Sequence, residues 1–379
     1  MTSLTPAEIR RYGRHFSLPQ VGVKGQEKLK RASVLLVGAG GLGSPLALYL
    51  AAAGVGVIGI ADFDVVDESN LQRQVLHGTA MLGQPKLASA VQRLRDLNPH
   101  VRVVRHDLRL AAANAPDIFA RYDVIADGAD NFPTRYLVND AAVLAGKPLV
   151  SGAIQGFLGQ LAVFNYRDGP CYRCLFPDMP PAGSVPSCAE GGVLGALPGV
   201  IGSLQAVEVM KILLEIGDAA SGTLLLYDAL KLSFDRLQIS KNPDCAACGP
   251  DRGLRPLHDP DDSCAAGPAG AGAPTAAVPE ITPGALQDGC AGVTLIDVRE
   301  AYERDICVID GALPIPLGEL EAACPRLDRQ ARIVVYCKGG ARSRQAARLL
   351  MEQGFTRVHS LAGGILAWID DVEPGKPKY

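Results

Sequence analysis

The sequence predicts an α/β protein in which a Rossmann-like, mostly parallel sheet is followed by a second, smaller α/β domain. Short apolar runs alternate with helical stretches in the first part of the chain, which is typical of a parallel sheet covered by helices. Around residue 250 the chain becomes rich in proline, glycine and alanine, and near residue 280 the alternation begins again. The length of 379 residues also favours two domains, since a domain typically has about 100–200 residues. We therefore expect domains over residues 1–249 and 280–379, joined by a flexible linker over 250–279.

The first domain opens with a strand at 33–37 (SVLLV), a glycine-rich turn at 38–43, a helix that ends at Gly54 and a strand at 57–62. This order is typical of a nucleotide-binding sheet. Further strands are predicted at 101–105, 122–128 and 148–152, and helices at 87–98 and 133–146. In the second domain we expect strands at 293–300 and 331–337 and helices at 342–354 and 363–371.

Composition narrows the classes of function. Hydrophobic residues make up 48% of the chain, enough to form buried cores, and the formal net charge of −3 gives no basic bias toward nucleic acid. The chain has no uninterrupted apolar run of about 18 residues and no apolar signal-peptide core near its start, so we expect a cytoplasmic protein without a membrane partner. In a reducing compartment, ten cysteines more often serve metal binding or catalysis than disulfides.

The turn GAGGLG at residues 38–43 follows a strand and precedes a helix, as a G-x-G-x-x-G phosphate loop does. Glycines let the backbone approach phosphates, and the helix N-terminus offers them unpaired N–H groups. Asp62 follows Gly43 by 19 residues, at the end of the next strand, where an acid usually binds a ribose hydroxyl. This pattern alone suits NAD as well as ATP.

The residues that follow favour ATP. Arg73 lies in SNLQRQ (69–74) and Lys86 in GQPK (83–86), and such cations stabilise phosphate oxygens and a leaving pyrophosphate. An NAD-dependent dehydrogenase has no need of them, although either residue alone would more often be a solvated surface charge.

Spaced in this way after GAGGLG, SNLQRQ and GQPK resemble the MoeB/ThiF family and the adenylation domains of ubiquitin-activating enzymes, over residues 5–249. The resemblance implies ATP contacts at positions that match the family's motif: Gly41, Asp62, Asn70, Arg73, Lys86 and Asn131. It also implies that Asp130 is the essential acid that positions Mg²⁺–ATP, a role in which a carboxylate suits a hard cation. Arg14 matches an arginine that reaches into the ATP site of the partner protomer, which implies a homodimer.

Two Cys-x-x-Cys pairs, Cys171 with Cys174 and Cys245 with Cys248, lie far apart in the sequence. Four thiolates in two such pairs fit tetrahedral Zn²⁺ in a closed structural site, and the matching family carries a structural zinc here. Redox use of one pair is the alternative.

Cys188 lies in a segment rich in proline and glycine, which suggests an extended crossover loop from which a thiol could reach an acyl adenylate. The position matches the thioester-forming or resolving cysteine of the ubiquitin-activating relatives. An inert loop cysteine is an equal alternative. Sequence spacing assigns no role to the remaining cysteines, Cys264, Cys290, Cys307 and Cys324.

Cys337 begins the loop CKGGARS (337–343) between an apolar strand and a helix, where backbone N–H groups form an anion cradle that favours thiolate and persulfide. The loop resembles the rhodanese active-site loop, and the similarity spans residues 280–372. Six residues from Cys337 to Arg342 suit sulfane sulfur, because the related arsenate reductases and Cdc-type phosphatases have a loop one residue longer. The family's usual Gly-His pair is absent from 305–312, outside the loop. A catalytically inactive docking module is the alternative.

Together these features predict an enzyme that adenylates the C-terminal glycine of a ubiquitin-like sulfur-carrier protein ending in Gly-Gly. A persulfide on Cys337, charged by thiosulfate or a cysteine desulfurase, would displace AMP and give a thiocarboxylate, with Cys188 as a candidate resolving thiol. The competing hypotheses are an NAD-dependent dehydrogenase, which explains neither Arg73 and Lys86 nor the cysteine pairs, and a non-catalytic scaffold. The pathway stays open between molybdopterin (molybdenum cofactor), thiamine, tRNA thiolation, cysteine and siderophore synthesis.

Overall fold

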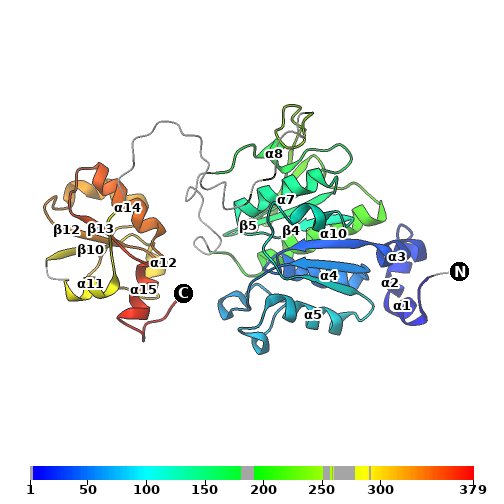
Figure 1. Cartoon of the computed structure of the whole chain (residues 1–379), viewed down its shortest axis with the longest axis horizontal. Coiled ribbons are helices and arrows are strands. Elements are labelled where there is room, and N and C mark those ends of the chain that lie inside the picture. The colour runs from blue at the N-terminus through cyan, green and yellow to red at the C-terminus, as the bar shows by residue number, and fades with distance from the viewer. Residues whose placement is uncertain (1–2, 181–191, 251–256, 258, 260–277, 290–291) are drawn as a thin grey trace. The chain divides into compact units, whose positions relative to one another are not determined.

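The computed structural model of the chain describes residues 3–180, 192–250, 257, 259, 278–289 and 292–379 (Figure 1). It divides into two compact units, Met1–Pro268 and Ala269–Tyr379, which are described separately below. Most of the predicted linker, 250–279, lies outside the described residues.

The first unit is built on an eight-stranded sheet with the strand order β3-β2-β1-β4-β5-β6-β7-β8. Its strands are β1 (Ser33–Val37), β2 (Val57–Ala61), β3 (Arg102–His106), β4 (Val124–Asp127), β5 (Leu149–Gln155), β6 (Leu158–Phe164), β7 (Thr223–Asp228) and β8 (Ser233–Gln238). The pairings from β3 to β5 are parallel, and those from β5 to β8 are antiparallel. The predicted mostly parallel sheet is confirmed, and the antiparallel edge is an addition that the sequence patterns did not reveal.

Register brings three strand ends together at one edge of this sheet. Val37 at the end of β1 lies opposite Ala61 of β2 on one side and opposite Asp127 of β4 on the other. The chain order of the strands reverses between β1 and β4, and ligands of open α/β sheets bind beside the carboxyl ends at such a point. The glycine turn after β1, Asp62 after β2 and the segment after β4 therefore emerge side by side.

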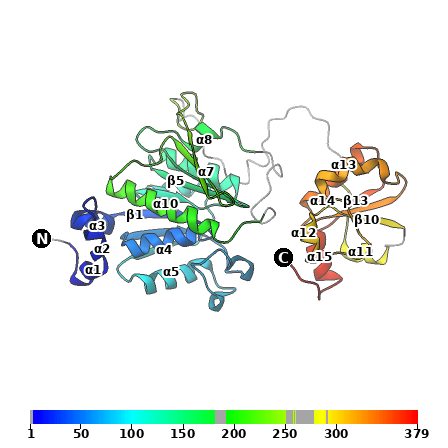
Figure 2. The same ribbon diagram turned by 180° about the vertical axis from the view of Figure 1, so that it is seen from behind.

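Helices cover both faces of the sheet (Figures 1 and 2). The helices of this unit are α1 (Pro6–Arg11), α2 (Gly13–Phe16), α3 (Gly22–Arg31), α4 (Gly43–Ala53), α5 (Lys86–Leu97), α6 (Ala115–Phe119), α7 (Phe132–Leu144), α8 (Tyr172–Leu175) and α10 (Leu197–Leu214), with short 3-10 turns at Glu68–Asn70 and Thr79–Met81. One core joins α3, α4, α5 and α10 to the sheet, and a second core joins α6 and α7 to its other face.

Helix α10 is long and apolar enough to cross a membrane by length and composition alone. In this fold 56% of it is buried, and it packs on α4 and β5. Its Gln205 is fully buried and donates hydrogen bonds to the carbonyl oxygens of Asp127 (2.8 Å) and Val150 (3.2 Å). These contacts account for the helix as part of the core.

The second unit has a five-stranded parallel sheet with the order β11-β10-β12-β13-β9. Its strands are β9 (Glu280–Ile281), β10 (Val293–Asp297), β11 (Leu313–Pro314), β12 (Arg332–Tyr336) and β13 (Val358–Leu361). Its helices are α11 (Pro283–Asp288), α12 (Ala301–Arg304), α13 (Leu320–Ala323), α14 (Ala341–Glu352) and α15 (Gly364–Asp371), with 3-10 turns at Leu317–Glu319 and Cys324–Arg326. Two apolar clusters fill it, one involving α13 and α14 and the other α11 and α15.

Gly43→Ala should destabilise the first unit by about 1–3 kcal/mol, because a methyl group at this first residue of α4 would overlap the carbonyl oxygen of Gly38. Urea unfolding followed by far-UV circular dichroism measures the change. The fluorescence of Trp368, the only tryptophan, reports the second unit and should not change.

The matched control for this prediction is Gly199→Ala in α10. An added methyl group there meets nothing within 4 Å, and the substitution should stabilise the helix by about 0.5–1 kcal/mol. Equal unfolding free energies for the two variants would contradict the proposed close approach of α4 to the turn.

Candidate functional site

A cavity of about 420 Å³ opens at the carboxyl edge of the first sheet. The sequence-predicted residues that line it come from five separate segments and are Gly41, Asp62, Asn70, Arg73, Lys86, Asp130 and Asn131. Arg14 is not among the lining residues; it is an exposed side chain on α2. The fold thus brings together the predicted nucleotide contacts of this chain and leaves Arg14 outside them.

The glycine turn is held by the acid that was predicted to bind ribose. Asp62 is largely buried, and its Oδ2 accepts a hydrogen bond from the backbone N–H of Ala39 at 2.7 Å. Its Oδ1 accepts from the N–H of Asp64 at 2.8 Å. A carboxylate offers about four lone-pair sites, so Asp62 keeps acceptor capacity for a ligand while it fixes the turn.

Cationic side chains are held at the cavity wall by local partners. Lys86 is buried and its Nζ lies 2.8 Å from Oδ2 of the more exposed Asp64. Arg73 donates to Oδ1 of Asn70 at 2.9 Å. These contacts orient positive charge toward a space that suits a polyanion.

Phe63 and Arg109 also line the cavity, and neither was predicted. Phe63 is 60% exposed, and the Arg109 guanidinium lies 5.8 Å from its ring centroid. The sequence did offer a signal for Phe63, which is an aromatic residue between two aspartates directly after a strand. Arg109 had no such signal, because only the fold places it beside Phe63.

Asp130 and Asn131 occupy the loop between β4 and α7. Asn131 caps α7, since its side chain accepts from the N–H of Thr134 at 2.9 Å. Asp130 is exposed at the cavity, and its Oδ1 lies 3.3 Å from Nδ2 of Asn131. Asn131 therefore has a structural role in addition to its predicted contact with ATP.

The buried ion pair between Arg135 and Asp127 supports this loop. Arg135 of α7 donates to the carbonyl oxygens of Gly152 (2.8 Å) and Ala129, and lies 3.5 Å from Asp127. Burial raises the pKa of Asp127, and the nearby Arg135 opposes that rise. Arg135 lies in the predicted helix 133–146, and nothing in the local sequence pattern shows that its side chain turns inward.

The four predicted metal ligands meet in one cluster. Cys171 immediately precedes α8 and Cys174 lies within this helix. Their sulfur atoms and those of Cys245 and Cys248 all lie within 4.8 Å of one another. The Sγ–Sγ distances are 3.9 Å for Cys171 and Cys174, 3.6 Å for Cys171 and Cys245, and 3.4 Å for Cys174 and Cys248. Four thiolates around one zinc ion lie about 3.8 Å apart, so the cluster has the size of a tetrahedral metal site.

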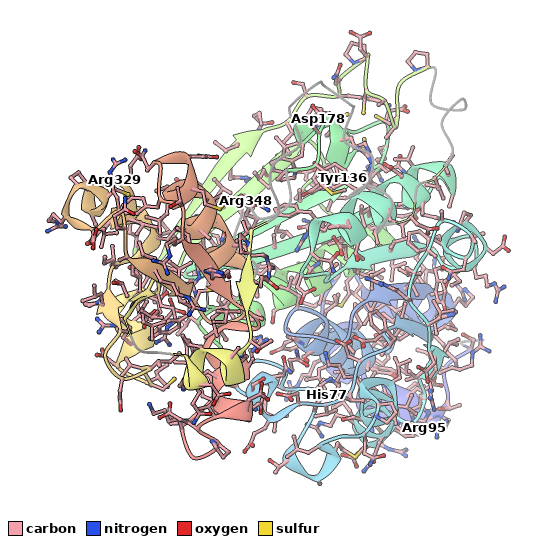
Figure 3. All side chains as sticks on the ribbon, turned by 60° about the vertical axis from the view of Figure 1, so that its left-hand side comes forward. His77, Arg95, Tyr136, Asp178, Arg329 and Arg348 are labelled. Atoms are coloured by element: carbon pink, nitrogen blue, oxygen red, sulfur yellow. The ribbon has the colours of Figure 1, made fainter. Side chains whose placement is uncertain are left out.

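Helix α8 is attached to α7 beside this cluster. Arg173 forms a bidentate pair with Asp140, with distances of 2.8 Å from both Nε and Nη2, and lies over the Tyr136 ring at 4.5 Å. The Tyr136 hydroxyl donates to the carbonyl oxygen of Asp178 at 2.6 Å (Figure 3). Cys188 follows this anchored segment but lies outside the described residues.

In the second unit, Cys337 follows β12 and is 2% exposed. The N–H of Gly340 donates to its Sγ at 3.1 Å, and Ser343 Oγ lies 3.6 Å away. Helix α14 begins at Ala341, so its N-terminus also lies beside the sulfur. One backbone donor and the N-terminal end of a helix therefore face this sulfur, which are two components of the anion cradle that the sequence predicts.

Arg342 is fixed by a network that the sequence did not reveal. Its two Nη atoms lie 2.6 Å from the two carboxylate oxygens of Glu303, which raises the pKa of Arg342. The Tyr379 hydroxyl donates to Glu303 at 3.0 Å and accepts from the buried Arg299 at 2.8 Å. Lys338 Nζ lies 4.8 Å from the Tyr379 ring centroid, so residues distant in sequence hold both cations of the loop.

The unassigned cysteines add no metal cluster among the described residues. Cys307 and Cys324 are buried in the second unit, and Cys324 donates to the carbonyl oxygen of Leu320 at 3.3 Å. Cys264 and Cys290 lie outside the described residues.

Comparison with known proteins agrees with this division. Residues 12–247 match the ThiF family and residues 282–371 match the rhodanese-like domain. The chain is 46% identical to a probable adenylyltransferase/sulfurtransferase MoeZ of Mycobacterium tuberculosis, over 100% of this chain and 97% of the relative. It is 45% identical to the adenylyltransferase and sulfurtransferase MOCS3 of Sus scrofa, over 100% and 89%.

A sulfur carrier protein adenylyltransferase of Thermus thermophilus is 56% identical over 69% of this chain and 98% of its own length. Among solved structures, Escherichia coli MccB with ATP has a TM-score of 0.54 and 22% identity, covering 65% of this chain and 75% of that one. MccB in complex with N-formylated MccA has a TM-score of 0.56 and 21% identity, covering 63% and 75%. At these identities the MccB structures show a shared fold.

Glu303→Gln should lower the free energy of unfolding of the second unit by about 1.5–3 kcal/mol at neutral pH, because the charged bonds to Arg342 are lost. Burial raises the pKa of Glu303. Hydrogen bonds from Arg342, from the N–H of Glu300 and from Tyr379 lower this pKa by more than burial raises it, so the pKa in the folded protein lies below the ordinary value of 4.5. The stabilisation is therefore complete above pH 4.5 and is lost as the pH falls through the folded-state pKa. The difference in the free energy of unfolding between wild type and Glu303→Gln should therefore become smaller below pH 4.5.

Urea titrations followed by Trp368 fluorescence measure this difference at each pH. Glu280→Gln is the matched control, because Glu280 and Arg344 form an exposed pair at 3.2 Å worth at most about 1 kcal/mol. A Glu303→Gln variant no less stable than this control would show that the network does not hold Arg342.

Proposed function

This chain belongs to the ThiF family and carries a rhodanese-like domain, and from that premise we propose that it activates and thiolates a ubiquitin-like sulfur-carrier protein. It is an enzyme with adenylyltransferase and sulfurtransferase activities. The observation that carries the adenylation half is the cavity in which Gly41, Asp62, Asn70, Arg73, Lys86 and Asp130 line one space. The observation that carries the sulfur-transfer half is the buried Cys337, whose sulfur accepts a backbone hydrogen bond.

In the first reaction, a carboxylate oxygen of the carrier's C-terminal glycine attacks the α-phosphorus of ATP. The bond from that phosphorus to the bridging oxygen breaks, and pyrophosphate leaves. Arg73 and Lys86 would bind the phosphate oxygens and stabilise the charge that grows on the leaving group. The exposed carboxylate of Asp130 fits a Mg²⁺ ion, which supplies charge neutralisation at the phosphates when bound.

In the second reaction, the terminal sulfur of a Cys337 persulfide attacks the acyl carbon, and AMP leaves. The product is an acyl disulfide between the carrier and Cys337. A thiolate then attacks the Cys337 sulfur, so that the carrier leaves as a thiocarboxylate and a new disulfide remains for an external thiol to reduce. Cys188 is our candidate for this thiolate, and thiosulfate or a cysteine desulfurase persulfide is our candidate sulfur donor.

We also propose a homodimer in which Arg14 of one protomer completes the nucleotide site of the other. The exposed position of Arg14 outside its own cavity supports this proposal. The identity of the carrier protein determines which biosynthetic pathway receives the sulfur. Molybdopterin synthesis and thiamine synthesis are both compatible with the proposed chemistry.

Asp130→Asn should reduce carrier-dependent exchange between pyrophosphate and ATP by about 10²–10³-fold, as loss of a preorganised charge at the reacting group does. Its transfer of sulfur from thiosulfate to cyanide should stay normal, because Cys337 lies in the other unit.

Cys337→Ala should keep normal exchange between pyrophosphate and ATP and lose sulfur transfer from thiosulfate. It should still make thiocarboxylate from free sulfide. The carrier is a small protein ending in Gly-Gly, and intact-mass measurement detects its products.

Wild-type exchange by Asp130→Asn would refute the adenylation assignment. Full thiosulfate-dependent thiocarboxylate formation by Cys337→Ala would refute the sulfur-transfer assignment. Turnover of NADH without pyrophosphate exchange would favour a dehydrogenase instead.

We propose that the four-cysteine cluster holds one structural Zn²⁺ per chain, since its donors are four thiols of tetrahedral spacing. Cys248→Ser should lose the metal and lower the thermal midpoint of the first unit by roughly 10 °C, because bound metal contributes directly to folding. Exchange activity per folded molecule should change little. Elemental analysis and calorimetry make these measurements.

Cys324→Ser is the control, because Cys324 is a buried cysteine of the other unit and should leave the metal content unchanged. Protein purified without chelators that contains no zinc would contradict the assignment.

A further inference from the structure

His77 is a buried histidine beside the nucleotide cavity that no step of the proposed reaction uses. It is 8% exposed and is not among the residues that line the cavity (labelled in Figure 3). Its Nε2 lies 2.9 Å from the carbonyl oxygen of Ala39, and its Nδ1 lies 3.0 Å from Oγ of Ser89. A carbonyl oxygen can only accept, so Nε2 carries the proton and Nδ1 accepts from the Ser89 hydroxyl. Both ring nitrogens of the neutral imidazole are therefore satisfied.

The contact with Ala39 constrains the glycine turn. The N–H of Ala39 donates to Asp62 at 2.7 Å, and its carbonyl oxygen accepts from His77, so the two peptide units on either side of the Ala39 Cα are each held by one hydrogen bond. Its neighbours are Gly38, with φ of +92°, and Gly40. Glycines are conformationally permissive and bring no side chain with which to fix themselves. The shape of the turn must therefore be imposed from outside it.

The backbone and the ring of His77 together join three walls of the cavity. Its backbone N–H donates to the carbonyl oxygen of Gln74 at 3.0 Å, which ties it to the segment that carries Arg73. Its Nδ1 bonds to Ser89 on α5, the helix that begins at Lys86. Its Nε2 reaches the glycine turn. Each of these three segments supplies a predicted ATP contact.

We propose that His77 is a positioning residue for adenylation, which holds the glycine turn, the SNLQRQ segment and the start of α5 in the arrangement that binds ATP. The proposal rests on the proposed function of the first unit. His77 acts through Ala39 and touches no substrate atom.

Two amide substitutions separate the two contacts of the ring. The amide nitrogen of His77→Gln can occupy the place of Nε2 and keep the bond to Ala39. The amide of His77→Asn reaches only the place of Nδ1, so this variant keeps Ser89 and loses Ala39. We expect His77→Asn to raise the KM for ATP about tenfold, equal to about 1.4 kcal/mol, as expected for one lost hydrogen bond. His77→Gln should stay within about threefold of wild type, and neither variant should change the KM for the carrier.

Two measurements do not depend on turnover. Equilibrium dialysis with ATP should show the same order of affinities as the KM values. Hydrogen–deuterium exchange should show faster exchange in peptides covering 38–43 for His77→Asn than for His77→Gln, since the turn loses one of its restraints. The thermal midpoint of the first unit is the folding control for each variant, and sulfur transfer from thiosulfate to cyanide is the control for an intact second unit.

Equal ATP affinities and equal exchange rates for the Asn and Gln variants would overturn the proposal. A loss of ATP affinity in both variants that is proportional to the fall in their thermal midpoints would also overturn it, because His77 would then serve stability alone.

If His77→Asn does not fold, Ser89→Ala provides the test. This variant removes the hydrogen bond to Nδ1 of His77 and should raise the KM for ATP about threefold, and an unchanged KM would count against the proposal. Failure of the proposed function is distinguishable, since it would appear as wild-type protein that neither binds ATP nor catalyses pyrophosphate exchange.

Discussion

The parallel register of β1 with β2 and β4 is the constraint on which the nucleotide site depends. Val37 lies opposite both Ala61 and Asp127, so the next residues of all three strands leave the sheet at the same place. The glycine turn and the acids Asp62 and Asp130 are distant in sequence and meet only because of this register. A shift of one residue in any of these strands would turn their buried side chains to the opposite face.

Several polar groups at the two sites serve the fold and the chemistry together. Asp62 fixes the glycine turn and still faces the cavity, and Asn131 caps α7 beside Asp130. In the second unit, Glu303 holds Arg342 while Gly340 donates to the Cys337 sulfur. Charged and polar groups held by such contacts need little rearrangement when a ligand arrives, which is the condition for electrostatic stabilisation of a transition state.

The cysteine cluster gives the antiparallel side of the first unit a similar support. The loop segment that contains Cys245 and Cys248 is joined to α8, and Arg173 and Tyr136 join α8 to α7 and to the start of the following segment. The two catalytic chemistries belong to separate units with cores of their own. Because one chain carries both units, the groups of each reaction are present at a raised effective concentration relative to separate proteins.

The sequence by itself determined the local features of this protein. Apolar runs predicted β1, β2, β4 and β12, the glycines predicted the turn before α4, and the spacing of Arg73, Lys86 and the cysteine pairs predicted the chemistry, because each of these signals lies within one short segment. Only the tertiary structure decided which distant segments meet. It placed Arg135 against Asp127, His77 against Ala39 and Tyr379 between Arg299 and Glu303, and it formed the antiparallel edge from β6 to β8. Such contacts depend on the path of the whole chain and on burial in a shared core, and neither is encoded in the spacing of neighbouring residues.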